Sequence, residues 1–432
     1  MSKNLKLTAA CLAGVLAPWL FAMAPAAADE QFAPTAVVQL PDTQILSAFD
    51  ISFVEPQTRT LAIAASRVVG SGGTPFGTVI IVNTQTNLVT KELHASPPFV
   101  GDCTVPPIRN NFSGPNGVIV VEKGRNADVW VGDGPVFNTP CVPTSGLKTP
   151  STVKVLDLHT GATKAVIPTG TGAGTKTPGI RRADELCYNP RSDVVLMAND
   201  DPLDNFITFI QEDSFKVLQR IRFDGTDPNG DNILANGIEQ CAFNPRDGKF
   251  YLNIPATGTT ASPGPGLVLT ISEHAPFHVE RVFTIDPVAT GCKGPNGLAV
   301  GPSNQMALGC GGANSLIINS TNGNPVATVT GEGGTDEAWY NPTANQYYFA
   351  RSAAAVLGVE DAGPPPTAAS TNNTPTAVGS HSVAADSNKN APSNKSQVYV
   401  PIRTGVLSPT ATICASKGGN NTYGCVAVFD AP

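Results

Sequence analysis

Short apolar runs separated by polar turns repeat along the whole chain, and none has the spacing of an amphipathic helix. The clearest unit is DELCYNP at residues 184–190, which returns as DEAWYNP at residues 336–342 with five of seven positions identical. In both copies an acidic pair leads into an apolar run, an Asn-Pro turn follows, and a second apolar run comes after the turn. This pattern predicts a β-hairpin.

Weaker copies of the same unit start near residues 50, 116, 239, 296 and 381, which gives seven units in all. Further apolar runs follow several hairpins, for example residues 77–83 and 88–93. Four antiparallel strands repeated seven times predict an all-β, seven-bladed β-propeller. The seventh unit is one strand short, so we expect residues 32–40 to close the ring beside residues 424–429. A two-sheet β-sandwich is the alternative, but it does not require seven similar units.

The composition agrees with many strands and turns. The chain has 42 glycines, 38 prolines and only 14% charged residues. It carries 27 basic and 34 acidic residues, so neither nucleic acid nor an anionic membrane surface is an expected partner. The polar tract 361–395 is expected to form mobile loops, including an insertion in the first hairpin of the seventh blade.

The first 28 residues have the features of a secretory signal peptide. Lys3 and Lys6 precede an apolar run at residues 7–21, and three alanines follow at 26–28. This run is too short for a membrane span. We therefore expect a single domain at residues 29–432 in a periplasmic or secreted protein. Cys11 leaves open a lipid-anchored alternative.

Eight of the nine cysteines follow this leader, and an even number in an exported protein favours disulfides. Their places in the repeat predict the pairs Cys103–Cys141, Cys292–Cys310 and Cys414–Cys425. Cys187 and Cys241 occupy equivalent places in consecutive units. They are expected to form a fourth disulfide, with paired thiolate metal ligands as the alternative.

The starts of the first strands are the main candidates for a functional site, because in a propeller they converge on the central channel. Around the ring they read Asp50, Asn116, Asp184 or Glu185, Glu239, Asn296, Asp336 or Glu337, and His381. Several carboxylates in one channel repel unless a cation neutralises them. The predicted metal ligands are Asp50, Asn116, Glu185, Glu239, Asn296 and Glu337. Oxygen ligands suit Ca²⁺, Mg²⁺ or Mn²⁺, and the imidazole widens the choice to Fe or Zn. In the alternative, the carboxylates cap backbone N–H groups and hydrate a water-filled channel.

Several motifs resemble the bacterial propeller superfamily that includes YVTN-repeat, streptogramin lyase-like and gluconolactonase-like proteins. They are Pro-Asn-Gly-aliphatic at 115–118 and 295–298, VIIVN at 79–83, SVAAD at 382–386 and VYVP at 398–401. In gluconolactonase-like members the resemblance implies a divalent metal held by Glu, Asn and Asp at inner-strand starts, which Asn116 and Asn296 match. Those relatives usually have six blades, and the His and Glu set of the streptogramin lyases is missing here.

The leading functional hypothesis is a metal-dependent hydrolase or lyase acting on a small organic substrate. The metal would polarise a carbonyl or ester, Glu239 or His381 would move a proton, and Arg351 would orient a substrate carboxylate. Lactone hydrolysis and elimination both fit this set. Arg351 could instead form a surface ion pair with Glu337 or Asp336.

The rival hypothesis is a non-catalytic periplasmic binding or scaffold propeller. It would bind a protein partner through the rim loops at residues 95–113, 133–150 and 361–395. No GxSxG, HExxH or P-loop motif is present to favour another catalytic class.

Overall fold

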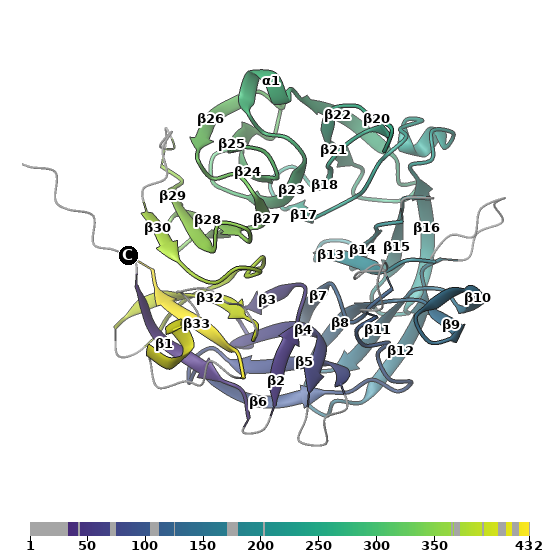
Figure 1. Ribbon diagram of the computed structural model, residues 1–432. Coiled ribbons are helices and arrows are strands. Elements are labelled where there is room, and N and C mark those ends of the chain that lie inside the picture. Colours follow the sequence, from purple (N-terminus) through teal and green to yellow (C-terminus); the bar gives the residue numbers. More distant parts are fainter. Residues whose placement is uncertain are drawn as a thin grey trace, which may run out of the picture. The chain divides into compact units, whose positions relative to one another are not determined.

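The computed structural model describes residues 33–41, 44–69, 75–103, 112–124, 126–170, 180–201, 204–363, 366, 372–390, 393–404, 412–416 and 423–431. The expected signal peptide and Phe32 lie outside these residues. Within the compact unit that starts at residue 31, seven sheets surround a central channel, as Figure 1 shows. Helix is confined to α1 (Pro287–Thr290), α2 (Thr412–Ser416) and one 3₁₀ turn, η1 (Pro228–Gly230), in the described part. No described helix is long and apolar enough to cross a membrane.

Each blade is an antiparallel sheet. In six blades the strands follow one another in chain order from the channel outward, and in the seventh the N-terminal strand is the outermost. The first blade contains β3 (Ser52–Glu55), β4 (Thr60–Val69), β5 (Pro75–Asn83) and β6 (Leu88–Leu93), with β2 (Ile45–Ala48) paired to the far end of β4. The second contains β7 (Val118–Lys123), β8 (Asn126–Asp133), β11 (Thr152–Asp157) and β12 (Thr163–Pro168). The third contains β13 (Ala183–Asn189), β14 (Val194–Asn199), β15 (Phe206–Gln211) and β16 (Lys216–Arg222).

The remaining blades repeat this order. The fourth contains β17 (Cys241–Asn244), β18 (Lys249–Ile254), β21 (Gly266–Ile271) and β22 (Val279–Ile285). The fifth contains β23 (Pro295–Val300), β24 (Gln305–Cys310), β25 (Asn314–Asn319) and β26 (Pro325–Thr330). The sixth contains β27 (Thr335–Asn341), β28 (Gln346–Arg351), β29 (Val356–Asp361) and β30 (Asn372–Pro375). The seventh contains β31 (Ala384–Asn390), β32 (Lys395–Ile402), β33 (Cys425–Asp430) and β1 (Pro34–Gln39).

The seventh blade confirms the expected ring closure. Strand β1 pairs with β33 in antiparallel register, with Val38 opposite Val426. Val38 is completely buried between the seventh and first blades. The N-terminal strand thus covers the edge that β33 would otherwise expose.

The Asn-Pro turns explain why the repeated sequence forms hairpins. Asn189 Oδ1 accepts a hydrogen bond from the backbone N–H of Arg191 at 2.8 Å, and Asn341 Oδ1 accepts one from Thr343 at 3.0 Å. These Asx contacts fix the first half of each turn. The last turn residue takes a positive φ of 54° at Asp193 and 55° at Asn345, a conformation that Asp and Asn adopt more readily than most residues.

The hydrophobic core consists of seven layers, one between each pair of neighbouring blades. Trp130 packs between the second and third blades, and Phe209, Phe250 and Phe277 pack between the third and fourth. Each sheet buries both faces, since it contributes to two layers. This is why the second and third strands are almost entirely buried and mostly apolar.

The glycine of the Pro-Asn-Gly motif is required by close contact between inner strands. A Cβ atom on Gly117 would fall on the Asp184 carbonyl group, and one on Gly297 would lie 2.6 Å from the backbone nitrogen of Ala338. In the same motif, Asn116 Nδ2 donates to the carbonyl oxygens of Ser113 at 2.9 Å and Ala183 at 3.2 Å. The motif therefore holds neighbouring first strands together around the channel.

All four expected disulfides are present: Cys103–Cys141, Cys187–Cys241, Cys292–Cys310 and Cys414–Cys425. Four disulfides are typical of a protein that folds in an oxidising compartment. Cys187–Cys241 joins β13 to β17, so it links the third and fourth blades.

Strand direction divides the connections between two faces of the ring. The connections from the first to the second strand and from the third to the fourth share one face, here called the turn face. The second-to-third connections and the connections between blades share the other, here called the insertion face. It includes the ribbon of β9 (Val136–Thr139) with β10 (Val142–Thr149) and the small pair β19 (Gly258–Thr259) and β20 (Ser262–Pro263).

The expectation for the polar tract 361–395 needs a correction. Its described part includes strands β30 and β31, and only four residues separate β31 from β32. The first hairpin of the seventh blade therefore has no insertion. The polar side chains of β31 are held by hydrogen bonds: Asp386 accepts from Thr84 Oγ1 at 2.5 Å, and Asn390 Nδ2 donates to the Thr84 carbonyl oxygen at 2.9 Å.

Ring closure makes β1 a determinant of stability. Val38→Ala should lower the free energy of unfolding by about 2 kcal/mol, because it leaves a cavity between two blades. Gln39→Ala, at an exposed position of the same strand, should change it by less than about 0.5 kcal/mol. Urea unfolding of the two variants measures the difference. Equal effects would mean that β1 does not close the ring in solution.

Candidate functional site

The upper channel, on the side of the insertion face, is organised around one arginine that the repeat pattern does not single out. Arg182 Nη1 lies 2.9 Å from Asp50 Oδ2, and its Nη2 lies 2.9 Å from Asp184 Oδ2. Arg182 comes from the connection between β12 and β13, and Asp50 lies two residues before the first strand of the first blade. The one signal in the sequence is the Arg181-Arg182 pair directly before the acidic repeat.

One guanidinium cannot compensate both carboxylates equally. Burial would raise the pKa of Asp50, but Arg182 and His381 together more than offset it, so this pKa lies below its ordinary value. Burial, only partly offset by Arg182, raises the pKa of Asp184 well above its usual range, and the charge of Asp50 adds to the increase. Asp50 is therefore the ionised member of the pair, and Asp184 is the one that more readily takes up a proton.

His381 supplies a second positive charge. Its ring stacks on Phe49 with centroids 4.8 Å apart, its Nε2 lies 3.4 Å from Asp50 Oδ1, and its Nδ1 lies 2.8 Å from the Gly379 carbonyl oxygen. Burial opposes protonation, but Asp50 and Asp336 outweigh it and raise the pKa of His381 to about 9. At neutral pH this geometry makes His381 an imidazolium that balances charge. His381 would act as a base only at a pH above its own pKa of about 9.

The three glutamates predicted as metal ligands all belong to the channel. Burial raises the pKa values of Glu185, Glu239 and Glu337 well above the usual range, and repulsion from neighbouring carboxylates contributes in each case. Glu337 accepts a hydrogen bond from the Val383 backbone N–H at 3.1 Å. Asp200 and Asp336 also have raised pKa values, again chiefly through burial. The ring of acids expected from the repeat is therefore present.

The predicted asparagine ligands have structural contacts. The Asn116 amide donates to two backbone carbonyl groups, as described above. The Asn296 backbone oxygen accepts a hydrogen bond from Asn253 Nδ2 at 2.9 Å, which ties the fourth blade to the fifth. Their contribution to a metal site stays a prediction.

Arg351 lies apart from the channel carboxylates. Its Nε lies 3.6 Å from Glu332 Oε2 and donates to the Gly333 carbonyl oxygen at 3.2 Å, and its Nη1 donates to Asn373 Oδ1 at 3.0 Å. The ion-pair partner is thus Glu332 rather than the expected Glu337 or Asp336. A role in orienting a substrate carboxylate stays a prediction.

The channel acids surround the axis without meeting at one point. Among the described residues, no group of three His, Cys, Asp or Glu side chains converges closely enough to hold a metal. The guanidinium of Arg182 lies between Asp50 and Asp184, where a cation would otherwise neutralise them. As placed, these side chains do not fit a preformed metal centre.

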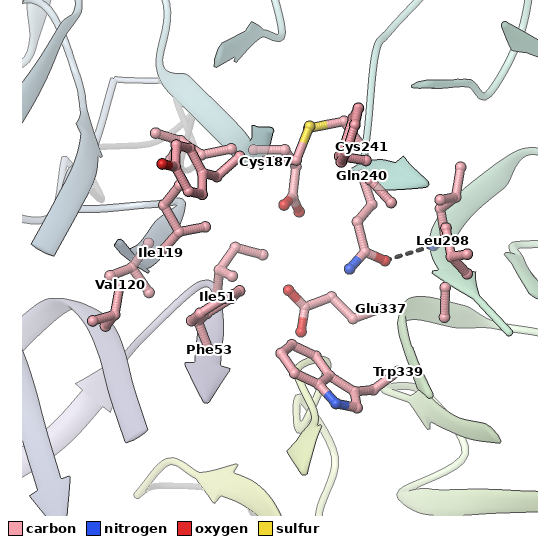
Figure 2. A pocket seen from close by; sticks show the side chains of 18 of the residues that line it. Ile51, Phe53, Ile119, Val120, Cys187, Gln240, Cys241, Leu298, Glu337 and Trp339 are labelled. Atoms are coloured by element: carbon pink, nitrogen blue, oxygen red, sulfur yellow. Dashed lines mark hydrogen bonds between the residues drawn. A yellow bond between two sulfur atoms is a disulfide. The ribbon is translucent and has the colours of Figure 1, made fainter. Parts of the chain in front are cut away.

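The lower channel, toward the turn face, contains a cavity of about 460 Å³. Glu185, Glu337 and Gln240 lie at its inner end, and Gln57 and Pro190 of the turns lie at its outer end. Gln240 Oε1 accepts hydrogen bonds from the backbone N–H groups of Leu298 at 2.6 Å and Ala338 at 3.3 Å, so one side chain joins three blades. Figure 2 shows Glu337 and Gln240 pointing into this space beside Trp339.

No protein family model matches this chain. No curated protein matches it either. The resemblance to YVTN-repeat, streptogramin lyase-like and gluconolactonase-like propellers thus rests on the sequence motifs alone.

Solved structures do match over most of the chain. The WD40 repeats of RRP9 align with a TM-score of 0.56 and 9% identity, over 93% of this chain and 99% of that chain. A chain of a mitotic checkpoint complex gives 0.54 and 13%, over 97% and 98%. Hydrazine synthase of Kuenenia stuttgartiensis gives 0.52 and 14%, over 76% and 96%. At these identities the likeness shows the fold alone: a seven-bladed β-propeller with WD40-like structural neighbours.

Proposed function

We propose that this protein is an exported propeller that binds a cation in its central channel. The observation that carries the proposal is the charge imbalance of the channel. Seven carboxylates are buried or half-buried there: Asp50, Asp184, Glu185, Asp200, Glu239, Asp336 and Glu337. The positive charges that lower their pKa values are those of Arg182, Arg181 and His381. An added cation would stabilise the carboxylates that these groups leave uncompensated.

The first ligand to test is a divalent metal, Ca²⁺, Mg²⁺ or Mn²⁺, at Glu185, Glu239 and Glu337. Fe and Zn are less suited, because the imidazole predicted for the site, His381, holds a proton at neutral pH. Hydrolysis of a lactone or elimination from a small substrate would follow only if a metal binds productively. The described side chains, as placed, do not form a metal centre, so metal binding would require them to move closer together.

The second candidate is a scaffold that binds a protein partner on the insertion face. It is favoured by the small satellite core of the rim, where Cys103, Phe112 and Phe137 pack together and Cys103–Cys141 ties two connections to each other. A rim whose loops are held together by a disulfide and a small hydrophobic core suits a docking surface. One structural neighbour is a chain of a mitotic checkpoint complex, and this is compatible with the same use of the fold.

Glu239→Gln tests the cation proposal. Chelator-treated protein should melt a few degrees higher when Ca²⁺, Mg²⁺ or Mn²⁺ is added, because a ligand of the folded state stabilises it by mass action. The variant should lose most of that shift. Without added cation it should be as stable as the parent or slightly more stable, since one repulsive charge is gone. Asp213→Asn, an exposed acid outside the channel, is the matched control. No cation-dependent shift in the unmodified protein would end the metal hypothesis.

Arg182→Gln tests the internal charge balance. It should lower the free energy of unfolding at pH 7 by about 3 kcal/mol, because Asp50 and Asp184 then lose the guanidinium that lies between them. Because the pKa of Asp50 is lowered in the folded state, its ionised carboxylate stabilises the fold above the pKa that it has in the unfolded chain. This stabilisation is lost as pH falls through the folded-state pKa. The penalty should therefore shrink toward pH 4. Arg281→Gln, at an exposed arginine of the outer strand β22, is the control, and an equal effect of both variants in urea unfolding would contradict the central role of Arg182.

His381 should stabilise the protein in its protonated form. Its pKa is raised to about 9 from an ordinary value of 6.5, so its contribution is complete below pH 6.5 and is lost as pH rises through 9. Relative to the parent, His381→Gln should cost up to about 3 kcal/mol at pH 6 and much less at pH 10. Urea unfolding across this range measures the difference, with His159→Gln, at an exposed residue, as control. A pH-independent cost would show that His381 is not the proton carrier.

A further inference from the structure

The lower-channel cavity combines aromatic walls with negative charge. Its lining comes from the first strands and turns of six blades and includes the rings Phe53, Tyr188, Phe243, Trp339 and Tyr340. Phe53 and Trp339 meet edge to face with centroids 5.5 Å apart. The lining also includes the glutamates Glu55, Glu122, Glu185 and Glu337, and no Lys, Arg or His from the described part of the chain.

Glu185 is the most informative of these side chains. It is 6% exposed, lines the cavity, and accepts no hydrogen bond from any described residue, whereas Glu337 accepts one from Val383. A mostly buried carboxylate without a protein donor is costly to keep ionised, because it has lost most of its contact with bulk water and gained no partner. A positively charged group in the cavity would remove that cost.

The lining also selects among cations. A bare metal ion needs six or so oxygen ligands at 2.0–2.6 Å, as a general rule, and the walls here are largely rings and aliphatic side chains. A neutral apolar molecule would bury Glu185 and Glu337 without compensation. An organic ammonium suits both the carboxylates and the aromatic walls, since its charge faces the carboxylates and its carbon groups contact aromatic faces. The cavity volume lies in the range typical of small-molecule sites.

We propose that the lower channel binds a small organic ammonium ligand. The ammonium lies at the inner end near Glu185 and Glu337, and the apolar body extends past Trp339 and Phe53 toward the turn face. Figure 2 shows how Glu337, Trp339 and Phe53 border one shared space. This proposal rests on the proposed cation binding, since both parts of the channel share these two carboxylates.

The outer end of the cavity suits the entrance of such a ligand. Glu55 and Glu122 lie beside Gln57 at the turn face, so the rim attracts cations and repels anions. Tyr188 and Tyr340 donate their hydroxyl protons to Asp193 at 2.8 Å and Asn345 at 3.0 Å on the same turns. These contacts fix both rings as walls and direct their polar ends outward.

The test compares choline with its neutral isostere 3,3-dimethylbutan-1-ol, by calorimetry on the full-length protein. Choline should bind at least about tenfold more tightly, because the two molecules differ only in charge. Trp339→Leu should weaken choline binding by about tenfold, and Trp339→Phe should restore part of it. Glu185→Gln and Glu337→Gln should each abolish most of the preference for choline. Asp213→Asn should behave like the parent, and thermal melts establish that each variant is folded.

The outcomes separate this proposal from the preceding one. Choline binding that is weakened in Trp339→Leu, together with an unchanged response of that variant to divalent metals, supports an organic ammonium site. A metal response without choline binding overturns the ammonium proposal and leaves cation binding intact. Absence of both overturns both. Equal binding of choline and its neutral isostere also overturns the ammonium proposal, since the cavity would then be a general apolar pocket.

Discussion

The structure depends on the close approach of seven first strands around one axis. Gly117 and Gly297 leave room for neighbouring backbones, and the side chains of Asn116, Asn253 and Gln240 hydrogen-bond across blades. Because the strands meet this closely, the residues that precede them converge on a narrow channel. Ring closure by β1 and β33 maintains that convergence, since a ring with an open edge would let the blades separate.

The same convergence creates the electrostatic problem that defines the site. A repeat that places acids at the start of four of its seven units also places several acids in one channel. Arg182 and His381 offset part of the charge, and burial raises the pKa values of most of the others. Charge that is expensive to bury and has no structural partner is more typical of a binding site than of a scaffold interior.

The upper and lower parts of the channel differ in character although they share carboxylates. The upper part is polar and contains the positive charges of Arg182 and His381. The lower part has aromatic walls, four glutamates and, within the described lining, no basic residue. Gln240 lies where the two meet and is held by backbone N–H groups of the fifth and sixth blades. A ligand that enters from the turn face therefore passes Glu55 and Glu122 at the rim and then the aromatic walls before it reaches Glu185 and Glu337 at the inner end.

The sequence alone determined the blade count, the ring closure and the disulfides, because each follows from a local repeat. The DELCYNP and DEAWYNP units contain their own turn chemistry in Asn189 and Asn341, and the equivalent Cys187 and Cys241 fall into the first strands of neighbouring blades. Only the tertiary structure decided the charge balance and the cavity. Arg182 belongs to an irregular connection outside the repeat, so no periodic argument could bring it to Asp50, 132 residues away. Arg351 shows the converse, since its place in the repeat suggested the channel, but its side chain pairs with Glu332. The repeat determines the backbone path of the blades. The partners of long side chains outside the repeat depend on which segments the closed ring brings together.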